Sequence, residues 1–131
     1  MMKTSKLKEA AAVYGTPLYV YDLDIIRKQY LELKNSMKKI PNLKIYFAAK
    51  ALSNISILKY FKGLGTGLET SSIEEVKIGL LCGFKKHEIL YSPNGVSLEE
   101  ITEAHKLGVN LNLDSLESIE EFVERYKGLD I

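Results

Sequence analysis

The sequence predicts an α/β fold in which short parallel strands alternate with helices. Glycines that follow helical patterns and precede short apolar runs recur at intervals of 20, 25 and 20 residues. Such a glycine supplies the left-handed residue that closes the last turn of a helix. Serines followed three residues later by glutamate precede the helical patterns, which is the arrangement of a capping box. The glycines are Gly63, Gly83, Gly108 and Gly128, and the serines are Ser72, Ser97 and Ser118.

The composition excludes several classes of protein. The 131 residues include 18 Lys and Arg against 17 Asp and Glu, and this balance of +1 argues against a surface that neutralises a nucleic-acid backbone. No apolar run approaches the roughly 20 residues of a membrane span, and the first residues do not resemble a secretory signal. Cys82 is the only cysteine, so an internal disulfide is impossible. We therefore expect a cytoplasmic protein without a membrane or nucleic-acid partner.

The first part of the chain contains an extended run and a long helix. Pro17 introduces the run 16–21, which alternates in the manner of a strand. A helical pattern covers about 23–39 and is followed by an apolar strand pattern at 43–50. Because the long helix separates 16–21 from the later strands, we expect that first strand to belong to a different sheet.

The repeat then supplies the remaining strands. Predicted strands cover 66–70, 88–92 and 109–114, and 129–131 is the expected start of another. Units of this length that alternate strand and helix form parallel sheets. Both an open doubly wound sheet and a (β/α)₈ barrel fit the pattern, and a complete barrel needs about 250 residues. If the fold is a barrel, the chain is therefore about half of one.

Functional groups in parallel α/β folds gather where the strands end. We interpret the serines at these positions, including Ser115, first as helix caps, because serine is a good N-cap. Lys50 has no such explanation, because it follows an apolar strand that ends in Ala48 and Ala49. In an apolar site its amine would lose solvation, its pKa would fall, and it could condense with an aldehyde. Spacing alone favours the alternative, a solvated lysine at a strand end.

Four further segments stand out in the chain, 14–22 (YGTPLYVYD), 46–54 (YFAAKALSN), 65–75 (GTGLETSSIEE) and 112–115 (NLDS). They resemble segments of the diaminopimelate decarboxylases, which are fold-type III decarboxylases that use pyridoxal 5′-phosphate (PLP). The segment 46–54 is similar to the tyrosine–alanine–X–lysine–alanine segment that carries PLP on its lysine. The order and spacing of the four segments agree with the family from about Val13 onward.

This resemblance implies a fold and a site. It favours the barrel, with 1–22 as a segment that gives a strand to a second β-domain and 23–131 as the first half of a PLP-binding (β/α)₈ barrel. Lys50 matches the PLP lysine, and Ala48 lies beside it in the same motif. Glu69 stands where the family usually has an aspartate near the cofactor. Glu75 matches a family glutamate, although it also completes the capping box at Ser72.

The resemblance also implies a reaction, the decarboxylation of meso-2,6-diaminopimelate to L-lysine by a homodimeric enzyme that binds a small amino-acid substrate. No metal ligand is expected. In the family, the phosphate-binding and substrate-binding residues lie beyond the position of Ile131, so we expect the chain alone to be nearly inactive. The alternatives are a related decarboxylase of ornithine, arginine or carboxynorspermidine, a PLP-binding barrel without turnover, and a half-barrel without enzymatic function.

Overall fold

The computed structural model of the protein describes residues 2–127. The chain divides into two compact units, Met1–Leu43 and Lys44–Ile131. Within the described range, no helix is both long enough and apolar enough to span a membrane. The predicted division into 1–22 and 23–131 concerns membership of a β-domain and a barrel, and it stays a prediction.

The first unit contains two helices, α1 (Thr4–Tyr14) and α2 (Leu23–Ser36). The carboxylate of Asp22 begins α2 by accepting hydrogen bonds from the backbone N–H groups of Asp24 and Ile25, at 3.1 and 3.3 Å. Between the helices, 16–21 is not a strand, contrary to the expectation from its pattern. A strand needs a hydrogen-bonded neighbour, and the described strands pair only with one another. The place of this segment in a second β-domain remains a prediction.

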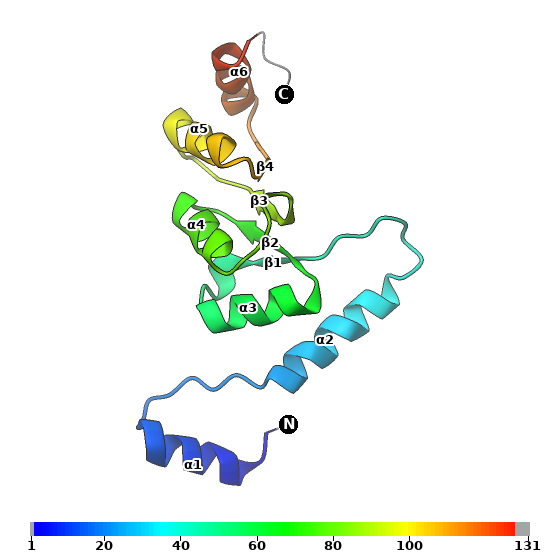
Figure 1. The fold of residues 1–131 in the computed structure, drawn as a ribbon, viewed down its shortest axis with the longest axis vertical. Coiled ribbons are helices and arrows are strands. Elements are labelled where there is room, and N and C mark those ends of the chain that lie inside the picture. The colour runs from blue at the N-terminus through cyan, green and yellow to red at the C-terminus, as the bar shows by residue number, and fades with distance from the viewer. Residues whose placement is uncertain (1, 128–131) are drawn as a thin grey trace. The chain divides into compact units, whose positions relative to one another are not determined.

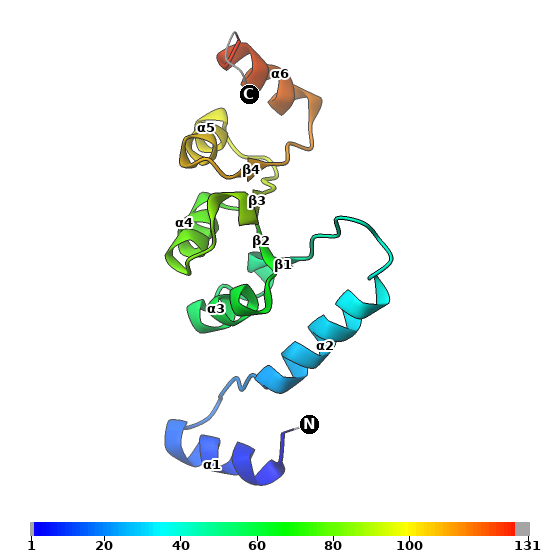
Figure 2. The same cartoon turned by 45° about the vertical axis from the view of Figure 1, so that its right-hand side comes forward.

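The second unit is a parallel sheet of four strands, in the order β1-β2-β3-β4. Helices follow the strands in strict alternation, as the sequence predicts, and α3, α4 and α5 lie along one side of the sheet (Figures 1 and 2). The strands are β1 (Tyr46–Ala48), β2 (Gly67–Thr70), β3 (Ile89–Tyr91) and β4 (Asn110–Leu111). The helices are α3 (Ile55–Leu64), α4 (Ile73–Leu81), α5 (Leu98–Leu107) and α6 (Leu116–Arg125), with short 3₁₀ turns η1 (Ala49–Ala51) and η2 (Lys86–Glu88).

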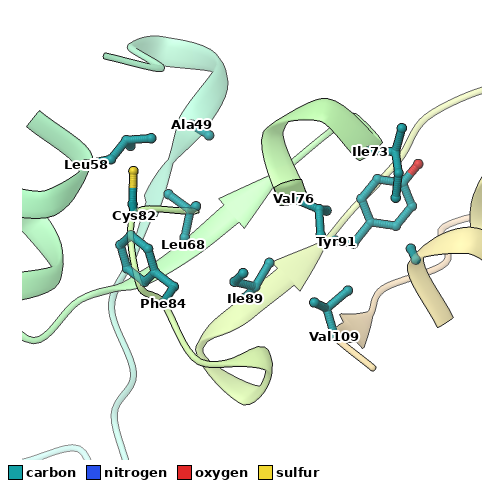
Figure 3. Packing of buried hydrophobic residues seen from close by; sticks show 11 residues of the cluster. Ala49, Leu58, Leu68, Ile73, Val76, Cys82, Phe84, Ile89, Tyr91 and Val109 are labelled. Atoms are coloured by element: carbon teal, nitrogen blue, oxygen red, sulfur yellow. The ribbon is translucent and has the colours of Figure 1, made fainter. Parts of the chain in front are cut away.

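Strand register divides the side chains between two faces of the sheet. Phe47, Leu68 and Ile89 lie side by side in neighbouring strands, and all three face the helices. The Phe47 ring stacks on Phe61 of α3 with 3.9 Å between the ring centroids. Leu68 and Ile89 are fully buried, together with residues of α3 and α4 such as Leu58 and Val76 (Figure 3). The core therefore lies between the sheet and its helix layer.

Glycine allows α4 to approach the sheet closely. A Cβ atom at Gly79 would lie 2.6 Å from Cδ2 of Leu68 and 3.2 Å from Cδ1 of Ile89. Both neighbours are 0% exposed, so neither side chain can swing into solvent to make room. The position of α4 on the sheet therefore depends on the missing side chain at residue 79.

The helix boundaries confirm most of the predicted caps and correct others. The hydroxyls of Ser72, Ser97 and Ser115 each accept a backbone N–H at the start of a helix. Ser118 is not a cap, because α6 begins one turn earlier, behind Ser115. Gly63 lies inside α3.

The left-handed residue that ends α3 is Gly65, with φ 84°. Gly83 and Gly108 have positive φ, as expected. Gly128 and the run 129–131 lie outside the described residues.

The glutamates of the predicted capping boxes bind elsewhere. Glu75 accepts the backbone N–H of Ser71, at 2.8 Å, rather than that of Ser72. Glu100 accepts the hydroxyl of Tyr91, at 2.7 Å, and the backbone N–H of Ile73, at 3.3 Å. The boxes at Ser72 and Ser97 are thus formed only in their serine halves, and their carboxylates are used for contacts outside their own caps. The box at Ser118 is not formed, because Ser115 caps α6.

Tyr91 is the largest fully buried side chain of the sheet, and its hydroxyl is held by Glu100. Burial, followed by the hydrogen bond and the negative charge of Glu100, raises the pKa of Tyr91 well above its ordinary value. The folded state therefore favours the neutral phenol over the phenolate.

Replacing Gly79 with alanine should lower the free energy of unfolding by about 1–3 kcal/mol, because the new methyl group overpacks the contact with Leu68 and Ile89. Urea denaturation followed by circular dichroism measures the change. Gly63→Ala is the matched control, since nothing lies within 4 Å of a Cβ atom at this helical position. That variant should be stabilised by about 0.5–1 kcal/mol. Equal effects at the two glycines would contradict the packing argument.

The buried tyrosine also predicts a pH dependence of stability. Because the folded pKa of Tyr91 is raised, its contribution is complete below the unfolded pKa of about 10 and is lost as the pH rises above it. The stability of the native chain should therefore fall more steeply above pH 10 than that of Tyr91→Phe. Denaturation midpoints measured across this range test the prediction, and parallel pH profiles for the two proteins would refute it.

Candidate functional site

Lys50 lies directly after the carboxyl end of β1, in the 3₁₀ turn η1. The turn is fixed by Ala49, which is 1% exposed in the core, and by the backbone hydrogen bond from Leu52 N–H to the Ala49 carbonyl, at 3.0 Å. Its neighbour Lys50 is exposed. The position agrees with the sequence analysis, but the expected loss of solvation is wrong for this chain. The core that holds Ala49 lies on the helix side and does not enclose the lysine.

Ala48 and Glu69 lie side by side in neighbouring strands, on the sheet face opposite the helices. The row continues across the sheet to Leu90 and Asn110. Ala48, Glu69 and Leu90 are half-buried, whereas Leu68 and Ile89 on the face toward the helices are fully buried. Since β2 also packs against η1, the Glu69 strand contacts the turn that carries Lys50. The structure thus places an amine, a carboxylate and a small side chain in one neighbourhood.

Glu75 lies in the first turn of α4, and its carboxylate is turned toward the loop after β2. Its Oε2 atom accepts the backbone N–H of Ser71 at 2.8 Å and the Ser71 hydroxyl at 3.3 Å. The hydroxyl of Ser72 meanwhile accepts the backbone N–H of Glu75, at 3.3 Å. Glu75 therefore holds the β2–α4 turn directly, a role that the capping-box pattern alone did not reveal.

Polar groups continue along the same edge behind β3 and β4. The backbone N–H of Ser92 donates to the Thr70 carbonyl, and that of Asn112 donates to the Tyr91 carbonyl, both at 2.8 Å. The side-chain amide of Asn112 donates to the Ser92 hydroxyl, at 3.3 Å. Both residues follow the ends of neighbouring strands, and their contact was not predicted from the sequence. Their equivalent positions after neighbouring strands were the available signal.

Other reactive groups do not join this edge. Cys82 is buried behind α4, and burial raises the pKa of its thiol, so it stays protonated and inert. Within 2–127, no three His, Cys, Asp or Glu side chains are grouped in a way that could hold a metal ion. The chemistry available at the edge is therefore that of an exposed primary amine on a turn that contacts the strand of Glu69. Such an amine can add to an aldehyde.

Comparison with known proteins supplies the family. The family described as pyridoxal-dependent decarboxylase, pyridoxal binding domain, matches residues 23–131. Diaminopimelate decarboxylase of Helicobacter pylori strain J99 is 39% identical over 109 residues, which is 82% of this chain and 27% of that protein. The enzyme of the same name from Campylobacter jejuni is 35% identical over the same shares of both chains.

A solved structure agrees with the sequence comparisons. The crystal structure of Helicobacter pylori diaminopimelate decarboxylase complexed with L-lysine superposes with a TM-score of 0.76 and 34% identity, covering 91% of this chain and 31% of that one. The chain spans about a quarter of the length of the curated relatives that it matches. The parallel strands and their alternating helices are therefore part of a barrel, and the chain belongs to the pyridoxal-dependent decarboxylases, whose cofactor is PLP.

Proposed function

We propose that this chain holds PLP through Lys50 as part of an amino-acid decarboxylase. The observation that carries the proposal is the exposed Lys50 amine at the carboxyl edge of β1, in contact range of the strand that bears Glu69. The finer proposal, based on the names of the relatives, is that the substrate is meso-2,6-diaminopimelate and the product L-lysine. We further propose a cytoplasmic homodimer as the working form.

The residues present fit the aldehyde end of the cofactor. The Lys50 amine is accessible, and Ala48 presents only a methyl group on the sheet face beside Glu69. When bound, PLP supplies an electron sink for the charge left by the departing carbon dioxide. The Lys50 amine would hold the aldehyde carbon by condensation with loss of one water molecule, and the Glu69 carboxylate would accept a hydrogen bond that orients the bound group. Glu75 keeps the β2–α4 turn in place through Ser71.

The carboxylate at residue 69 reaches further than the aspartate that stands at this position in the family. Its backbone is fixed by pairing with β1 on one side and β3 on the other. Because the strand is fixed, the carboxylate oxygen of Glu69 lies about one methylene group further from the backbone than that of an aspartate would. We propose that this chain accommodates the shift through the flexible Lys50 side chain rather than through the sheet.

Incubation with PLP followed by borohydride should label Lys50 in preference to the other lysines, because its amine is exposed on a turn at the end of β1 that contacts the strand of Glu69. Peptide mass spectrometry locates the label and gives the rate at each lysine. Lys44 is the matched internal control, since it is exposed and precedes the same strand at its opposite end. Lys50→Arg should remove the preferred label, whereas Lys44→Arg should leave it unchanged. Equal labelling of Lys44 and Lys50 would refute a preorganised site.

Turnover is a separate test. The 131-residue chain spans 27% of the Helicobacter pylori relative, so we expect little or no carbon dioxide release from meso-2,6-diaminopimelate, even with PLP present. A coupled carbon dioxide assay makes the measurement, with ornithine as the comparison substrate. Robust release from the purified chain would show that the groups described here are sufficient, and preference for ornithine would overturn the proposed substrate.

A further inference from the structure

One oxygen atom of Glu100 connects three elements of the sheet and helix layer. Its Oε1 accepts the hydroxyl of Tyr91 in β3, at 2.7 Å, and the backbone N–H of Ile73 at the start of α4, at 3.3 Å. Glu100 itself belongs to the first turn of α5. Figure 3 shows the Tyr91 ring next to Ile73, on the helix side of the sheet. The contact is therefore internal to the layer and lies beneath the β2–α4 turn.

The contact of Glu100 with Ile73 lies at the β2–α4 turn, which directly follows the strand that bears Glu69. Ile73 follows Ser71 and Ser72, and these follow the end of β2, where Glu69 lies. Glu75 holds Ser71 through two hydrogen bonds, and Glu100 holds the amide of Ile73. Two carboxylates thus fix a turn of two residues. Only Glu100 extends that constraint to the next strand and helix.

The chemistry of the contact suits a fixed acceptor. The donors that Glu100 contacts, a phenol and a backbone amide, are both neutral. Both bonds end on the same oxygen atom, Oε1, and the carboxamide of glutamine also carries one acceptor oxygen. The nearby Lys77 is paired with Glu103 at 2.8 Å, on the exposed surface of α4 and α5. A neutral amide at residue 100 can therefore replace the carboxylate as an acceptor without changing the donors.

We propose that Glu100 is a positioning residue for the Lys50 and Glu69 site. Through Ile73 and Tyr91 it fixes the β2–α4 turn, so that the strand bearing Glu69 ends in one conformation beside η1. The expected effect of Glu100 on PLP labelling at Lys50 rests on the proposed function. The effect of Glu100 on the β2–α4 turn does not. A role in cofactor placement is thereby assigned to a side chain that binds Tyr91 on the helix side of the sheet (Figure 3).

The test compares Glu100→Ala, Glu100→Gln and the control Glu103→Ala in the full 131-residue chain. Hydrogen exchange at the Ile73 amide and the rate of borohydride-trapped PLP labelling at Lys50, relative to Lys44, are measured for each protein. Glu100→Ala should raise the exchange rate and lower the relative labelling rate, each roughly tenfold, because a displaced turn loosens the alignment of the site. Glu100→Gln should restore both values, and Glu103→Ala should leave both unchanged.

The outcomes separate this inference from the proposed function. If PLP labels Lys50 and Lys44 equally in the native chain, the proposed function fails. Independently of that result, an unchanged hydrogen-exchange rate at the Ile73 amide in Glu100→Ala would overturn the positioning role. If Lys50 is preferred and Glu100→Ala matches Glu103→Ala in both measurements, only the positioning role is overturned. Should Glu100→Ala unfold, Tyr91→Phe replaces it, since it removes one donor while keeping the buried ring. Faster Ile73 exchange and slower Lys50 labelling in that variant support the proposal, and native values in both refute it.

Discussion

Parallel pairing in register is the constraint on which the site depends. Because Ala48 pairs with Glu69, and Glu69 with Leu90, the carboxyl ends of β1, β2 and β3 reach the same edge of the sheet. The turns that follow therefore meet there, and residues far apart in sequence become neighbours without any long connection. A shift of one residue in β2 would exchange its two faces and move Glu69 into the layer now filled by Leu68.

The two faces of the sheet serve different purposes. The helix face is packed with fully buried side chains, and its tightest contact is the approach of Gly79 to Leu68 and Ile89. The opposite face carries half-buried residues, among them Glu69. The buried packing is concentrated on one side, and the proposed cofactor residue Glu69 lies on the other. Glu75 and Glu100 both bind the turn that leads from the sheet into α4.

Much of this architecture could be predicted from the sequence because local signals and tertiary structure agree. The predicted helix caps form at Ser72, Ser97 and Ser115. The strands also follow the helix-ending glycines in the predicted order. Ser118 was misleading because two serines three residues apart both satisfy the local rule, and only packing selects between them. The exposure of Lys50 and the partners of Glu100 depend on contacts between elements, which no local pattern contains. The partner of Glu75 is local, but the capping-box rule predicts Ser72 where the structure has Ser71. The role of Lys50 in cofactor binding is a proposal that rests on resemblance to the family.

The accessibility of Lys50 has a consequence for selectivity. An uncovered primary amine discriminates poorly among carbonyl compounds, so reducing sugars and small dialdehydes can compete for it as readily as a vitamin-derived ligand. Discrimination must then come from recognition of the remainder of the ligand, its ring and its phosphate. A ligand held at Lys50 would therefore be selected by contacts other than the covalent bond itself.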